Sequence, residues 1–106
     1  MLRSIKPEEF MAIKKDDAMV VLDIRRDSDY NASEDIIPGA TWRDPANIDE
    51  WIASVPKETQ VVIYCVRGGG VSNSVVDRLQ ADGINAQFIE GGIEGLKDVG
   101  GIVDRK

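Results

Sequence analysis

Cys65 is the single cysteine of this 106-residue chain, and three consecutive glycines follow it at positions 68, 69 and 70. Glycine permits backbone angles that are closed to other residues, so the N–H groups of such a loop can point at one centre and bind an anion. A helix beginning near Val71 would add the positive end of its dipole at the same place. Cysteines beside helix N-termini ionise more readily than free cysteine. We therefore expect Cys65 to be a thiolate nucleophile.

The loop expected to hold this sulfur consists of Val66, Arg67, Gly68, Gly69, Gly70 and Val71. Its main-chain N–H groups would stabilise negative charge on the sulfur, as an oxyanion hole stabilises developing charge. Arg67 supplies the loop's own positive charge, and we expect it to bind an anionic ligand rather than point into water.

A plainer interpretation is that Cys65 is a small buried hydrophobe and that the glycines only form a turn. The combination of strand, cysteine, glycine-rich loop and amphipathic helix favours the reactive site. The chain contains no histidine, which excludes a Ser-His-Asp triad, a Cys-His pair and any histidine metal ligand. We expect neither a metal nor a cofactor.

Composition limits the class of protein. Hydrophobic residues make up 42% and charged residues 30% of the chain, values typical of a soluble globular protein. The net charge of −6 argues against nucleic-acid binding, which needs clustered Lys and Arg. A lone thiol suits a reducing compartment, and neither a signal peptide nor a membrane-spanning run is apparent. We expect one cytoplasmic domain, residues 1–106, without membrane contact.

The elements that must position Cys65 alternate between strand and helix. Residues 19–24 and 60–65 predict buried strands, and residues 85–92 predict another short strand that ends in a glycine pair. Helical patterns cover 7–15, 45–55 and a stretch from Val71 to a stop at Gly83. Another short strand follows the Pro-Gly turn of 36–42, a short helix lies within 25–35, and a last helix holds Ile93 and Leu96. This order predicts an α/β fold, a three-layer domain with a central mostly parallel sheet flanked by helices. Active sites of such sheets form beyond the carboxyl ends of strands, where Cys65 lies.

Four segments, in this order, resemble the rhodanese-like sulfurtransferases. LDIRRDSDY is similar to the family's D-[VI]-R-x-x-x-E-[YF] segment, with Asp29 in place of Glu, and IIPGA is similar to its H-I-P-G-A segment. VIYCVRGGGVSNSVVDRLQADGI resembles the active-site strand, loop and helix, and FIEGGIEGLKD the closing strand and helix start. The resemblance covers nearly the whole chain and implies the rhodanese fold.

What the resemblance implies for function is sulfane-sulfur transfer. Cys65 would take the outer sulfur of thiosulfate or a similar small anionic donor and become a persulfide. A thiophilic acceptor (cyanide, a thiol or a protein cysteine) would then remove that sulfur. Such double displacement is covalent catalysis with ping-pong kinetics.

The chain departs from the family pattern at several positions. Gly70 stands where many active members have Arg or Ser, and Val71 stands where Ser is frequent. Ile36 replaces the usual His, and Ile93 and Leu96 replace the usual aromatics. These departures leave the donor and the turnover with thiosulfate open.

Other charged and aromatic residues have supporting roles in this interpretation. Asp23 and Arg25 resemble the family's structural pair near the site, an ion pair that holds the loop after the strand. Arg25, Arg26 and Arg43 are candidate rim charges for an anionic donor. We assign Trp42 and Trp51 to the core or its edge.

Two other functions remain open. A low-turnover persulfide carrier or redox-sensing module would use the same sulfur with a partner protein. A Cys-x5-Arg phosphatase is less favoured, because the position that requires Arg holds Val71. A glycine-rich nucleotide loop is weaker still, because no Lys-Ser/Thr pair follows the glycines.

Overall fold

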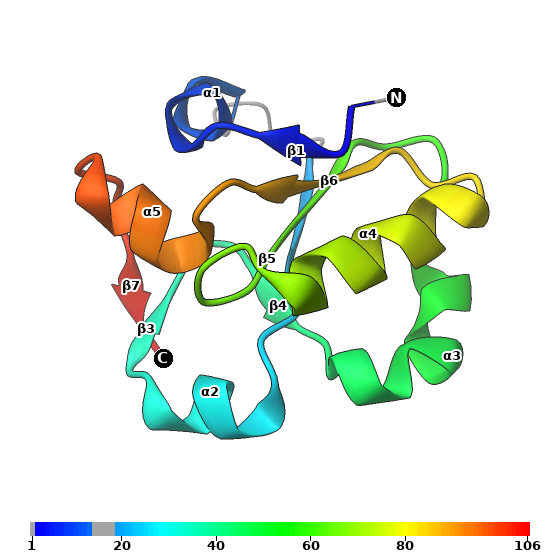
Figure 1. Ribbon diagram of the computed structural model, residues 1–106, viewed down its shortest axis with the longest axis horizontal. Helices are drawn as coiled ribbons and strands as arrows, with labels where there is room; N and C mark the ends of the chain where they lie inside the picture. Colours follow the sequence, from blue (N-terminus) through cyan, green and yellow to red (C-terminus); the bar gives the residue numbers. More distant parts are fainter. Residues whose placement is uncertain (1, 14–18) are drawn as a thin grey trace.

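The computed structural model describes residues 2–13 and 19–106. Five parallel strands form the central sheet in the order β1-β6-β5-β2-β4 (Figure 1). The bounds of these strands are Ser4–Ile5 (β1), Val20–Asp23 (β2), Thr41–Trp42 (β4), Val61–Tyr64 (β5) and Ala86–Ile89 (β6). The predicted α/β architecture with a parallel central sheet is confirmed.

The bounds of the helices are Pro7–Ile13 (α1), Asp27–Ala32 (α2), Ile48–Trp51 (α3), Gly70–Ala81 (α4) and Gly92–Asp98 (α5). Four of these helices lie in two layers, α3 and α4 on one side of the sheet and α1 and α5 on the other, whereas α2 lies beyond the end of the sheet (Figure 1). Side chains of α3 and α4 belong to one hydrophobic cluster, and side chains of α1 and α5 belong to the other. Among the described residues, no helix is long and apolar enough to cross a membrane.

Strand β5 contributes to the hydrophobic clusters on both sides of the sheet, because its side chains alternate between them. Val61 and Ile63 pack in the cluster of α3 and α4, whereas Val62 and Tyr64 pack in the cluster of α1 and α5. All four are fully buried, which is why this segment reads as a continuous apolar run in the sequence. Cys65 continues the alternation and joins the α4 side.

Several elements differ from the sequence-based expectation. The helix expected over residues 45–55 is divided into the 3-10 turns Pro45–Asn47 (η1) and Ile52–Ser54 (η2) with α3 between them. A second, antiparallel sheet pairs β3 (Asp35–Ile36) with β7 (Asp104–Arg105). Neither β1 nor β7 was expected, since two-residue strands carry no periodicity.

The ends of two helices were also expected from the sequence. α4 is followed by Gly83 at φ +82°, which confirms the predicted stop. The predicted end of the first helix at Lys14 and Lys15 lies outside the described residues.

Candidate active site

Cys65 follows directly on β5, at the carboxyl end of the central strand. The residue is buried, with 7% of its surface exposed. Two donors contact Sγ: the backbone N–H of Gly68 at 3.2 Å and the hydroxyl of Ser72 at 2.9 Å. Of the six loop amides between Val66 and Val71, only that of Gly68 donates to Sγ here. Fewer main-chain N–H groups therefore contact the sulfur than predicted, and the hydroxyl of Ser72 supplies the second hydrogen bond.

Ser72 is the residue that the sequence analysis missed. It is the third residue of α4 and is fully buried. The signal was present, because Ser72 lies three and four residues before Val75 and Val76 on the buried side of the helix. A hydroxyl on an apolar stripe needs a hydrogen-bond partner, and the sulfur of Cys65 is that partner.

Two glycines shape the loop around Cys65. Gly68 has φ +71°, and a Cβ atom there would lie 2.9 Å from the nitrogen of Gly91. Gly92 has φ +63°, and a Cβ atom there would lie 2.4 Å from the carbonyl oxygen of Cys65. Both positions therefore require glycine. At Gly69 and Gly70, by contrast, an added Cβ would meet no atom within 4 Å.

The first turn of α5 holds the start of the loop. The N–H of Ile93 donates to the carbonyl of Cys65 at 3.0 Å, and the N–H of Glu94 donates to the carbonyl of Val66 at 3.1 Å. The chain can approach so closely only because Gly92 has no side chain. The glycine pair at the end of the FIEGG segment thus fixes the orientation of the Cys65 loop.

A pocket of about 280 Å³ opens above Cys65. Its walls come from the loop and from the start of α2, namely Cys65, Val66, Arg67, Gly69, Gly70, Val71, Arg26 and Asp29. Within the described ranges, neither Arg26 nor Arg67 forms an ion pair, whereas Arg25 and Arg78 do. Two uncompensated guanidinium groups beside one carboxylate make this pocket suitable for a small anion. Arg43 does not line it.

Asp23 and Arg25 form a buried ion pair beside the pocket rather than in its wall. Arg25 Nη2 lies 2.6 Å from Asp23 Oδ2 and also donates to the carbonyl of Asp35 at 2.9 Å. Burial lowers the pKa of Arg25, but the hydrogen bond and charge of Asp23 outweigh this effect and the net shift is upward. Tyr64, the neighbour of Cys65, donates its hydroxyl to Asp23 Oδ2 at 2.9 Å. Burial raises the pKa of Tyr64 far above its ordinary value, and the charge of Asp23 adds to this shift.

This network ties the ends of β2 and β5 together and leaves Arg26, the next residue, at the pocket. Neither tryptophan lines the Cys65 pocket. Trp42 stacks on Tyr30 with ring centroids 4.8 Å apart and donates to the carbonyl of Arg25. Trp51 is a core residue that is 8% exposed.

Comparisons with known proteins agree with this geometry. A rhodanese-related protein from Thermoplasma volcanium superimposes with a TM-score of 0.85 at 23% identity, over 97% of this chain and 98% of that chain. A Staphylococcus saprophyticus protein superimposes with a TM-score of 0.79 at 28% identity, over 97% of this chain and 99% of that chain. A rhodanese-like domain protein from Staphylococcus aureus superimposes with a TM-score of 0.82 at 27% identity, over 99% of each chain. A search of curated proteins gives no match.

The sequence itself matches a family model. Residues 6–98, nearly the whole chain, match the model described as Rhodanese-like domain. The same span contains Cys65, the glycines that shape its loop, and the serine that contacts its sulfur. The chain therefore belongs to the rhodanese-like domain family.

Proposed function

We propose that the protein is a sulfurtransferase that carries a sulfane sulfur on Cys65. The thiolate attacks the outer sulfur of thiosulfate or a similar anionic donor, an S–S bond forms, and sulfite leaves with the electron pair of the broken bond. A thiophilic acceptor then attacks the outer sulfur of the persulfide, and Cys65 leaves again as a thiolate. No external oxidant or reductant is needed in either step.

The observation that carries this proposal is the pair of donors on Sγ, the Gly68 N–H and the Ser72 hydroxyl. Hydrogen bonds to a charged acceptor are about twice as strong as neutral ones, so both donors favour sulfur in its anionic form. Arg26 and Arg67 line the pocket above it and match the charge of the donor.

The phosphatase alternative is disfavoured by the same loop. A Cys-x5-Arg loop grips phosphoryl oxygens with the two parallel N–H bonds of its arginine. The corresponding residue, Val71, has an apolar side chain that packs against the hydrophobic cluster. Arg67 lies on the other side of the glycines and cannot take that position in the loop.

The persulfide carrier, which would release its sulfur only to a partner protein, remains the second candidate. Gly70 favours it, because many active members of the family have Arg or Ser at this position and the loop here lacks that group for holding a small anionic donor. Steady-state cyanolysis with thiosulfate separates the two: sustained turnover supports the enzyme, and a single loading event supports the carrier.

Intact mass spectrometry after thiosulfate treatment tests both candidates together. Cys65 is the only thiol, so the protein should gain the mass of one sulfur atom, and a reductant should remove it. Cys65→Ser is the control and should gain nothing. An unmodified wild-type protein, or a loaded Cys65→Ser protein, would refute the proposal.

A further inference from the structure

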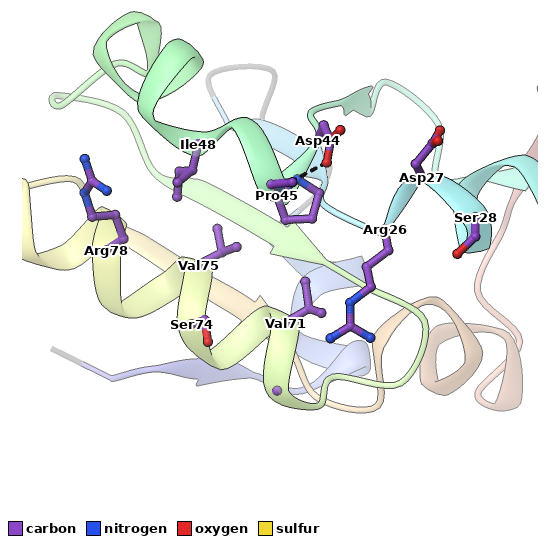
Figure 2. A pocket seen from close by; sticks show the side chains of 12 residues that line it. Arg26, Asp27, Ser28, Asp44, Pro45, Ile48, Val71, Ser74, Val75 and Arg78 are labelled. Carbon is purple, nitrogen blue, oxygen red and sulfur yellow. Dashed lines mark hydrogen bonds between the residues drawn. The ribbon is translucent and has the colours of Figure 1, made fainter.

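A larger groove adjoins the Cys65 pocket. It has a volume of about 850 Å³ and lies between α4 and the segment formed by η1 and α3 (Figure 2). Arg26, Gly70 and Val71 line both the groove and the Cys65 pocket. The two spaces therefore adjoin at these three residues, and a small anion in the pocket would leave the groove unused.

The groove has an apolar floor. Val71 and Val75, one turn apart on α4, point toward Pro45 and Ile48 in Figure 2, with Arg26 at one end. From Val71 to position 78, α4 rises roughly 10 Å at about 1.5 Å per residue. About three residues of extended chain cover the same length.

Gly70 keeps the passage between the two spaces open. Neither a left-handed backbone nor a neighbouring atom requires glycine at this position, since an added Cβ would meet nothing within 4 Å. A side chain at position 70 would instead project into free space at the junction. The absence of a side chain at Gly70 thus leaves the space between Cys65 and the groove unobstructed.

We propose that this groove binds an extended, cysteine-containing segment of a partner protein and delivers its cysteine to Cys65. Apolar side chains next to the partner's cysteine would lie on Val71, Val75, Pro45 and Ile48. This inference rests on the proposed function and names the acceptor of its second step. The partner's thiolate attacks the outer sulfur of the Cys65 persulfide, a new S–S bond forms on the partner, and Cys65 departs as a thiolate.

The exposure of the walls favours a protein segment over a small thiol. Ala46, Ser74 and Arg78 line the groove and are all exposed, so a small molecule would remain largely in water. Sites for small molecules normally bury most of the ligand surface. A short segment covering such a groove makes a small interface, and small interfaces suit transient contacts.

Charge specifies the partner further. Among the described residues, Arg26, Asp27 and Asp44 line the groove without forming an ion pair, whereas Arg78 is held by Asp49 at 2.6 Å. Two carboxylates against one guanidinium group leave the groove with an excess of negative charge. The chain as a whole carries a net charge of −6. The complementary segment has a cysteine beside apolar residues and carries Lys or Arg next to them.

Synthetic peptides test this inference in single-turnover reactions. The acceptors are acetyl-Cys-Leu-Leu-Lys-amide and its Ser-Ser counterpart, together with the reversed pair Lys-Leu-Leu-Cys and Lys-Ser-Ser-Cys, because either chain direction fits the groove. Thiosulfate-loaded protein is mixed with each peptide, and the loss of sulfur is followed by mass spectrometry. In one of the two chain directions, the leucine peptide should react about tenfold faster than the serine peptide. Burying leucine in the groove lowers the free energy of the complex.

A second arm does not depend on persulfide chemistry. Unloaded protein reacts with the same peptides as thiopyridyl disulfides: Cys65 attacks the peptide sulfur, a mixed disulfide forms, and coloured thiopyridone leaves. The leucine preference should appear here too. If loading with thiosulfate fails but the leucine preference is present, the proposed function is wrong and the inference that the groove binds a peptide segment is supported.

Matched variants locate the effect. Ala46→Trp fills the groove, whereas Ala53→Trp places the same side chain at an exposed alanine of η2 that does not line it. Ala46→Trp should reduce the leucine-to-serine rate ratio to about one, and Ala53→Trp should retain the wild-type ratio. A ratio near one in the wild type for both directions, a ratio that survives Ala46→Trp, a ratio lost in Ala53→Trp, or free cysteine reacting as fast as the leucine peptides would each overturn the inference.

Discussion

Replacing Ser72 with alanine removes one of the two donors to the Cys65 sulfur and leaves the Gly68 amide. A hydrogen bond to a charged group stabilises by about 1.5–3 kcal/mol. We take the lower end, because sulfur is a weak acceptor. Since 1.4 kcal/mol is a factor of about ten, loss of this hydrogen bond should change the rate at which Cys65 is alkylated by no more than about tenfold.

The net change should be smaller than this factor. A sulfur anion that loses a stabilising donor becomes a better nucleophile, with a Brønsted slope of about 0.4–0.5, and this gain offsets part of the loss. We expect Ser72→Ala to be alkylated about threefold more slowly than the wild type.

Iodoacetamide labelling followed by intact mass spectrometry measures this rate directly, because Cys65 is the only thiol. Ser74→Ala is the matched control, since it makes the same change on the same helix at an exposed position. Alanine is also a better helix former than serine, so the fold should persist. Equal labelling rates for Ser72→Ala and the wild type would show that the hydroxyl does not act on the sulfur.

Three further changes test the loop, the pocket and a surface ion pair. Gly68→Ala should lower the free energy of unfolding by at least about 1–2 kcal/mol in urea titrations, because the residue is left-handed and its Cβ would meet the nitrogen of Gly91. Gly69→Ala, which meets no neighbouring atom, should cost much less, and equal losses would contradict the steric argument. Arg67→Ala should raise the KM for thiosulfate in steady-state cyanolysis about two- to fivefold, as expected for an exposed charge pair. An unchanged KM would remove Arg67 from the donor site. Lys97→Gln should lower the free energy of unfolding near neutral pH, because Lys97 lowers the pKa of Asp35 below its ordinary value of 3.8. The folded state then binds the Asp35 proton less tightly than the unfolded state does. The stability that the Lys97–Asp35 pair contributes is therefore present at pH values above 3.8 and disappears as the pH falls through the lowered pKa of Asp35. A difference between wild type and Lys97→Gln that persists in strong acid would contradict this assignment.

Much of the fold was predictable because its main elements carry local signals. Residues 61–64 are apolar without interruption, so a strand covered on both faces followed from the sequence. The spacing of Val75, Val76 and Leu79 predicted α4. β1 and β7 have no such signal, because a two-residue strand exists only where a partner strand is already in place.

The site was predictable in part for the same reason. Cys65 and its glycine loop are contiguous in the chain, so the sequence alone was enough to predict that a loop shaped by glycine surrounds the sulfur. The positions of Ser72 and Arg26 relative to the sulfur depend on how α4 and the start of α2 pack against the sheet. The Tyr64–Asp23 hydrogen bond joins two strands that are far apart in the sequence.

The sequence by itself determined the alternation of strands and helices, the family and the place of the lone cysteine at the end of a buried strand, because each depends on neighbouring residues or on an ordered set of motifs. Only the tertiary structure decided which donors contact that sulfur, which glycines are sterically required, and that a groove continues from the Cys65 pocket along α4. These features arise where separate segments meet, and local propensity does not encode the distances between segments that only packing brings together.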